Sequence, residues 1–214
     1  MKIRISILSL IVSLAVPCTG LAQSAPGRLH KLTNIESSYP FWSPDGDRIV
    51  FQSNRIDENG EIYVMNADGT GLLRLTFAPG DDLTPVWSPD GQWIAFQSHR
   101  DGDPEIYLMR PDGSGQVNLT NDPVEDSHPS WSPDGRRIIF DRPVDGDNDE
   151  VWEMDIDGGD LRRITDDPSR DTYASISPDG ARIVWRRRFR DPQVEGGFGN
   201  SEVFVMNRDG SDPL

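Results

Sequence analysis

The feature that most constrains this chain is a short turn sequence that returns at an almost constant interval. The pentapeptide WSPDG occupies residues 42–46, 87–91 and 131–135, and ISPDG follows at 176–180, so successive copies are 45, 44 and 45 residues apart. Proline favours the first central position of a type I turn, and glycine accepts the left-handed conformation that follows. Each copy therefore predicts a hairpin turn. The structural turn residues are Asp45, Gly46, Asp90, Gly91, Asp134, Gly135, Asp179 and Gly180.

The rest of each period repeats as well. An apolar segment follows every turn, at 48–51, 93–96, 137–140 and 182–185. A second segment then begins with glutamate, an Asp-Gly turn comes next, and the first three periods end in a short segment closed by threonine. Each period thus predicts four short antiparallel strands. Runs that are apolar throughout, such as Ile138-Ile139-Phe140, indicate burial on both faces.

A single sheet of this kind cannot bury both of its faces, whereas copies arranged around an axis can. The sequence therefore predicts an all-β fold, a β-propeller of four-stranded antiparallel blades with four repeats. The expected domain covers residues 23–214, with blades at about 39–76, 84–120, 128–165 and 173–214. Segment 29–33, Leu-His-Lys-Leu-Thr, matches the fourth strand of a blade, and the last period ends where its own fourth strand should form.

We expect this N-terminal strand to complete the last blade and to close the ring, which would remove two exposed sheet edges. Two alternatives stay open. The chain could be an open fragment of a larger propeller, or it could pair through its open blades with a second copy; otherwise it would be a monomer.

The full pattern, WSPDGxxIxF followed by EIYxMNxDG and a closing LT, resembles the WD-like β-propeller repeats of the TolB family over residues 29–214. The resemblance implies a periplasmic propeller whose first strand in each blade is innermost. It also implies protein partners of the cell envelope, as in the Tol–Pal system, notably the peptidoglycan-associated lipoprotein. This chain differs from TolB because no α/β domain precedes the repeats and because it has four repeats where six are usual.

The first 22 residues are typical of a secretory signal peptide. Basic residues precede the apolar run 5–16, and the small residues of 20–22 suit cleavage before Gln23. We therefore expect a periplasmic or secreted protein with no membrane insertion after cleavage. Cys18 is the only cysteine, and the proline before it departs from the lipoprotein signal, so anchoring through this residue is not expected.

Composition and motifs argue against several functions. The formal net charge of −15 disfavours nucleic acid and anionic lipid as partners. The sequence contains no G-x-S-x-G elbow, no P-loop and no H-E-x-x-H motif. We therefore expect a non-catalytic protein-binding module without a cofactor, whose partner is a periplasmic or outer-membrane-associated protein.

The variable loops of an up-and-down propeller gather on one face, where specificity usually resides. The residues aligned just before each first strand are Tyr39, Thr84, His128 and Tyr173, and carboxylates stand two positions earlier in three repeats, at Asp82, Asp126 and Asp171. We expect these residues to form a partner-binding rim, in which the carboxylates attract cations and the aromatic rings anchor. Alternatively, the aspartates cap loop turns and the rings plug the channel.

Two further readings concern chemistry. His128 with the three rim aspartates suggests, as an alternative function, a channel-mouth enzyme such as a metal-dependent lyase or hydrolase acting on a polysaccharide. Asp145, Asp147 and Asp149 alternate along one loop and offer the hard oxygens that Ca²⁺ prefers. This loop lacks the glycine and glutamate of an EF-hand, so a solvated acidic loop is the competing interpretation.

Recurring charges also predict structural pairs. Arginines recur at the end of the second strand, at Arg55, Arg100 and Arg142, opposite the recurring glutamates Glu61, Glu105 and Glu150. We expect Arg–Glu pairs within each blade rather than a catalytic set of glutamates.

Overall fold

The computed structural model describes residues 31–34, 36–56, 58–146, 148–191, 193 and 197–211. The chain divides into two units, residues 1–31 and 32–214, and the second unit contains every described strand. The expected signal peptide lies outside the described residues. Within them all regular structure is β, and no helix that could cross a membrane occurs.

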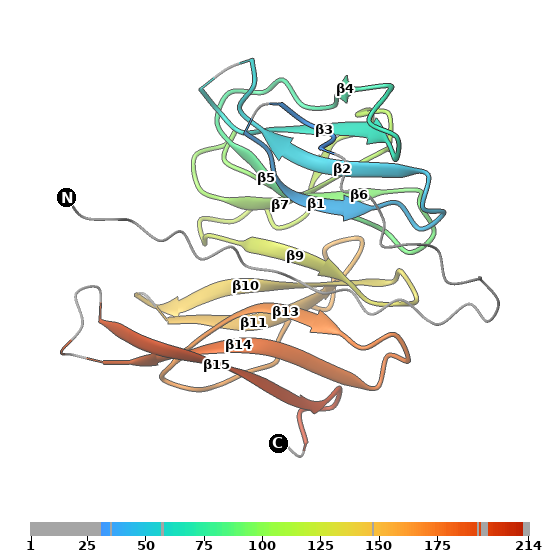
Figure 1. Ribbon diagram of the computed structural model, residues 1–214. Coiled ribbons are helices and arrows are strands. Elements are labelled where there is room, and N and C mark those ends of the chain that lie inside the picture. The colour runs from blue at the N-terminus through green and yellow to red at the C-terminus, as the bar shows by residue number, and fades with distance from the viewer. Residues whose placement is uncertain are drawn as a thin grey trace. The chain divides into compact units, whose positions relative to one another are not determined.

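The strands form separate antiparallel sheets in chain order, three with four strands and a fourth with three described strands (Figure 1). We call these sheets blades one to four. The strands are β1 (Ser38–Trp42), β2 (Arg48–Ser53), β3 (Glu61–Asn66) and β4 (Leu73–Arg74); β5 (Asp82–Trp87), β6 (Ile94–Ser98), β7 (Glu105–Met109) and β8 (Val117–Asn118); β9 (Ser127–Trp131), β10 (Arg137–Asp145), β11 (Asn148–Asp155) and β12 (Arg162–Arg163); and β13 (Arg170–Ile176), β14 (Arg182–Arg190) and β15 (Phe198–Asn207). The all-β propeller prediction is confirmed.

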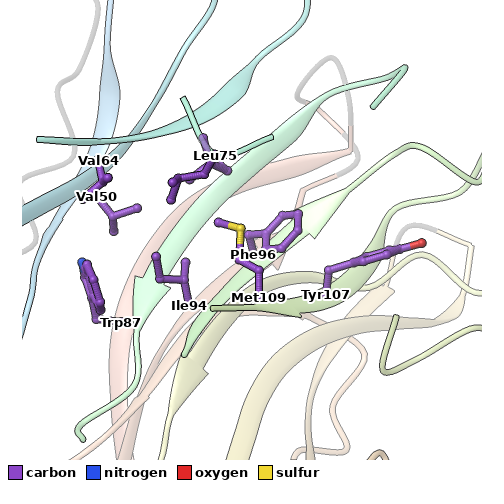
Figure 2. Close-up of a cluster of buried hydrophobic side chains, with 9 residues drawn as sticks. Val50, Val64, Leu75, Trp87, Ile94, Phe96, Tyr107 and Met109 are labelled. Carbon is purple, nitrogen blue, oxygen red and sulfur yellow. The ribbon is translucent and has the colours of Figure 1, made fainter. Parts of the chain in front are cut away.

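An apolar layer fills each junction between consecutive blades. Between blades one and two, side chains from β2, β3 and the segment after β4 of blade one pack against side chains from β5, β6 and β7 of blade two (Figure 2). This layer consists of Val50, Ile62, Val64, Leu75, Trp87, Ile94, Phe96, Tyr107 and Met109. Equivalent layers join blades two and three and blades three and four. Because every middle blade contributes both faces, its strands are apolar throughout, as the sequence indicates.

The SPDG turns share one hydrogen-bonded geometry. In the first turn Ser43 Oγ donates to Asp45 Oδ1 at 2.5 Å, the Arg48 amide donates to Ser43 Oγ at 2.9 Å, and Gly46 has a φ of 77°. The other three turns repeat the Ser–Asp bond at 2.6 Å. This bond from serine is the main reason that the pKa of each turn aspartate lies below its ordinary value.

The recurring glutamates bond to the fourth strand of their own blade. Glu61 is buried and accepts hydrogen bonds from Thr76 Oγ1 and Arg74 Nη2, both at 2.6 Å. Blade three repeats this arrangement with Thr165 and Arg163 around Glu150. Arg–Glu pairs within a blade therefore exist, but their arginines come from the fourth strand. This corrects the expectation for Arg55, Arg100 and Arg142.

Blade four differs from the others because β13, β14 and β15 are its only described strands. Residues 31–33 are described and belong to no strand, whereas residues 29–30 lie outside the described part. No backbone contact joins the described strands of blade four to those of blade one. Completion of the last blade by segment 29–33 is therefore not seen in the described residues.

Candidate functional site

The innermost strands share an unusual backbone conformation at the predicted rim positions. Tyr39, Thr84, His128 and Tyr173 have φ values of 51°, 49°, 53° and 57°. Each of them lies where the register between the first and second strands of its blade shifts. A positive φ is strained for residues other than glycine and persists only where the surrounding structure imposes it. The fold thus keeps one strained position in every blade, and this position holds tyrosine in blades one and four, threonine in blade two and histidine in blade three.

Three of these side chains meet although they come from three blades. The rings of His128 and Tyr173 are 4.0 Å apart between centroids. Burial, the negative charge of Tyr39 when ionised and a hydrogen bond with Tyr39 raise the pKa of Tyr173 to about 12. We call Tyr39, His128 and Tyr173 the aromatic cluster. Thr84 is buried instead, and its amide donates to Gln52 Oε1 at 2.8 Å.

A cation and a buried carboxylate support this cluster. The Arg186 guanidinium lies 4.5 Å from the centre of the Tyr173 ring, a favourable cation–π geometry. Asp141 is fully buried beneath the cluster, accepts from the Tyr173 amide at 3.0 Å and lies 2.8 Å from Nδ1 of His128. Burial raises the pKa of this carboxyl group.

When His128 is neutral, its contact with Asp141 places the ring proton on Nδ1, because a carboxylate accepts a hydrogen bond. Among the residues that the structure describes, Nε2 of His128 makes no hydrogen bond. This nitrogen is therefore available to accept a proton or to contact a ligand. Sequence reasoning missed Asp141. The available signal was that Asp141 takes the place of Gln52 and Gln97 in the preceding repeats.

The predicted rim aspartates do not face solvent. Asp82, Asp126 and Asp171 are almost fully buried. Each binds, with both carboxylate oxygens, an arginine that lies in or just after the second strand of its own blade. For Asp126 the two distances to Arg142 are 2.7 and 2.6 Å; Arg100 and Arg187 repeat the arrangement. A buried carboxylate requires such a partner. This placement corrects the expectation that these carboxylates attract a cationic partner.

The acidic loop of blade three is divided between different environments. Asp145 is exposed, whereas Asp149 is buried and accepts a hydrogen bond from Arg170 Nε. Asp147 lies outside the described residues. Within the described part of the chain, no group of three or more histidine, cysteine or acidic side chains is placed to hold a metal ion.

Taken with the fold, this site defines a class: a β-propeller of consecutive antiparallel sheets whose first strands carry an aromatic cluster. The family described as TolB beta propeller domain matches residues 26–122. This part of the chain is therefore similar to a TolB-type propeller, and the resemblance predicted from the repeats is confirmed.

Solved structures show the same likeness. A structure described as TolB from Agrobacterium tumefaciens is 26% identical with a TM-score of 0.71, over 81% of this chain and 62% of that one. TolB from Acinetobacter baumannii is 27% identical with a TM-score of 0.66, over 80% and 41%. This chain thus spans less than two thirds of either relative. An oligogalacturonate lyase in complex with manganese is 14% identical with a TM-score of 0.61, over 82% and 51%, and shows the fold alone. A comparison with curated proteins finds no match.

Proposed function

We propose that this chain is an exported, periplasmic propeller that binds another protein at its channel mouth and does not catalyse a reaction. The observation that carries the proposal is the strained backbone at the four rim positions, three of which assemble the aromatic cluster. The likeness to two TolB structures supports an envelope role, and the N-terminal sequence supports export.

The chemistry of the cluster suits protein recognition. Tyrosine and histidine rings offer large apolar surfaces with polar tips, which is the composition of interface anchors. Arg186 contributes a positive charge beside Tyr173 in a chain that is acidic overall. Because Asp82, Asp126 and Asp171 are neutralised by arginine, the partner would meet aromatic and cationic groups at this site. A surface loop with an aromatic or acidic tip is the complement that these groups favour.

Titration calorimetry with purified peptidoglycan-associated lipoprotein tests this proposal. Tyr39 is partly exposed, so Tyr39→Ala should weaken binding by about tenfold or more, the usual effect of losing an aromatic anchor. Gln92→Ala, an exposed change beside an SPDG turn, is the matched control and should bind like the unaltered chain. Equal affinities for both variants would exclude the channel mouth, and no binding by any form would exclude this partner.

The His128–Asp141 pair supports a second candidate, a channel-mouth enzyme acting on a polysaccharide. Nδ1 of His128 is held by the carboxylate at 2.8 Å, which orients Nε2 as a general base. The three rim aspartates, in contrast, are engaged by arginine. Release of unsaturated or shortened oligosaccharides from acidic polysaccharides, lost in His128→Ala, would establish this candidate; equal release by both forms would exclude it.

A further inference from the structure

Blade four presents an apolar face whose counterparts elsewhere are buried. Val203 in β15 is 77% exposed, whereas the aligned residues of the other blades are fully buried. Those residues are Ile62, Ile106 and Val151. Val184 in β14 is likewise exposed where its counterparts are fully buried. In blades one to three the fourth strand and the next blade cover these positions.

The covering strand binds through a fixed set of hydrogen bonds. In blade one the Leu75 amide donates to the Ile62 carbonyl at 2.8 Å, and the Ile62 amide donates to Thr76 Oγ1 at 2.9 Å. The threonine hydroxyl in turn donates to Glu61. Blades two and three repeat all three bonds. A Leu-Thr or Ile-Thr pair is therefore the element that recognises the Glu-hydrophobic pair of the third strand.

Blade four displays the receiving half of this arrangement. Glu202 and Val203 are the corresponding Glu-hydrophobic pair, and both are exposed. The donating half lies at the other end of the described chain, where Leu32 and Thr33 carry the Leu-Thr pair. The two halves have matching side chains and matching order, so an antiparallel pairing would set Val203 opposite Leu32 and Glu202 opposite Thr33.

Leu32 is already positioned as the end of a preceding blade. A Cβ added to Gly69 of blade one would lie 3.4 Å from Leu32 Cδ2. In the same manner Leu75 lies against Gly113 of blade two, where the carbonyl oxygen would be 2.7 Å from the added atom. Leu32 thus stands where the fourth strand of a blade before blade one belongs. Blade four of the same chain does not fill that place, since no backbone contact joins the described strands of blades one and four.

We propose that blade four of one copy packs on blade one of a second copy and accepts the second copy's Leu32-Thr33 as its fourth strand. The Leu32 amide would donate to the Val203 carbonyl, the Val203 amide to Thr33 Oγ1, and the Thr33 hydroxyl to Glu202. Both halves of the junction are present on every chain, so a second copy supplies each of them. The contact is head-to-tail and therefore builds a ring or a longer assembly according to its rotation.

An aromatic contact at the same junction supports this occupant. Trp42 in β1 is 55% exposed, whereas Trp87 and Trp131 at the equivalent positions are buried by the preceding blade. Arg48 of blade one lies 4.6 Å from the Trp87 ring across the first internal junction. Arg182 occupies the place of Arg48 in blade four and is exposed. It would cover Trp42 of the second copy in the same manner.

Sedimentation equilibrium of the full chain over a range of concentrations gives the first test. We expect a mass above that of one chain that falls on dilution. Val203→Glu should raise the dissociation constant by at least about tenfold, because it buries a charge in the junction. Val117→Glu is the matched control, since Val117 is a 53% exposed valine in the fourth strand of blade two. A single-chain mass at every concentration, or equal dissociation of both variants, would overturn the proposal.

Cross-linking distinguishes a second copy from closure within one chain. In a Cys18→Ser background, Thr33→Cys and Glu202→Cys chains are mixed and treated with a short thiol cross-linker. We expect a linked pair of chains from this mixture and none from Thr33→Cys mixed with Val117→Cys. The variant that carries both cysteines should also link between chains. A product confined to single chains would show that blade four closes on its own N-terminal segment and would overturn the second copy as occupant; no product at all would overturn the pairing itself.

Discussion

Removal of the buried arginine of blade three should be far more costly than removal of its counterpart in blade one. Arg142 binds Asp126 through two hydrogen bonds of 2.7 and 2.6 Å, and both residues are buried. Arg142→Met would keep most of the apolar stem and leave the carboxylate buried without its charge partner. Breaking one side of a buried ion pair costs about 3–5 kcal/mol. This is a large share of the 5–15 kcal/mol that typically separates folded from unfolded domains.

Blade one supplies a matched control within the same fold. Ser37 takes the place of the aspartate there, and Arg55 Nη2 donates to Ser37 Oγ at 3.3 Å. Arg55→Met strands no buried carboxylate of this kind. It loses long hydrogen bonds to Ser37 and Ser53 and cation–π contacts with Phe51 and Tyr63, together worth about 1–2 kcal/mol.

Equilibrium unfolding in urea, followed by tryptophan fluorescence, measures both free energies. The double variant Asp126→Asn with Arg142→Met should recover part of the loss, because the buried charge is then removed. If Arg142→Met and Arg55→Met lower the free energy of unfolding by equal amounts, the argument that the aspartate needs its arginine fails.

Three further predictions follow from the same structure. Burial raises the pKa of Glu105 above its ordinary 4.5, so the folded chain binds the Glu105 proton more tightly than the unfolded chain does. The free energy of unfolding therefore falls as the pH rises through the window above 4.5. Glu105→Gln should flatten this fall when urea unfolding is measured across pH. Gly113→Ala should cost about 1–3 kcal/mol more than Gly46→Ala in thermal unfolding, because both have positive φ but only the first meets a backbone oxygen, at 2.7 Å. Tyr39→Phe should lower the pKa of Tyr173 from about 12. The measurement is a phenolate titration, in which a Tyr173→Phe variant identifies the signal of Tyr173. An unchanged titration of Tyr173 would contradict its contact with Tyr39.

The repeats predicted the local structure well because turns and strands depend on neighbouring residues. Ser43 and Asp45 lie two positions apart and form the turn bond that the SPDG motif implies. The rim positions could also be found. The strained residue lies at the same place in every blade, so it also lies at the same place in every repeat of the sequence. Tyr39 and His128 were located in this way, although their contacts were not.

Contacts between distant residues could not be obtained from the period. Asp141 and Tyr173 are separated by 32 positions and meet only because the second strand of one blade faces the inner strand of the next. The same applies to Asp126, which lies in a loop that alignment placed at an open rim. Its partner Arg142 in β10 is brought to it by hairpin geometry, and the pair is then buried.

The sequence by itself determined the number of repeats, the order of the strands and the chemistry of each turn, because these are set by propensities that act over a few residues. The tertiary structure decided which polar side chains are exposed and which are paired, and it left the apolar face of blade four without a described fourth strand. Burial depends on what packs against a residue. The repeats in the sequence specify a neighbour on both sides of each middle blade, but on only one side of the first and the last blade.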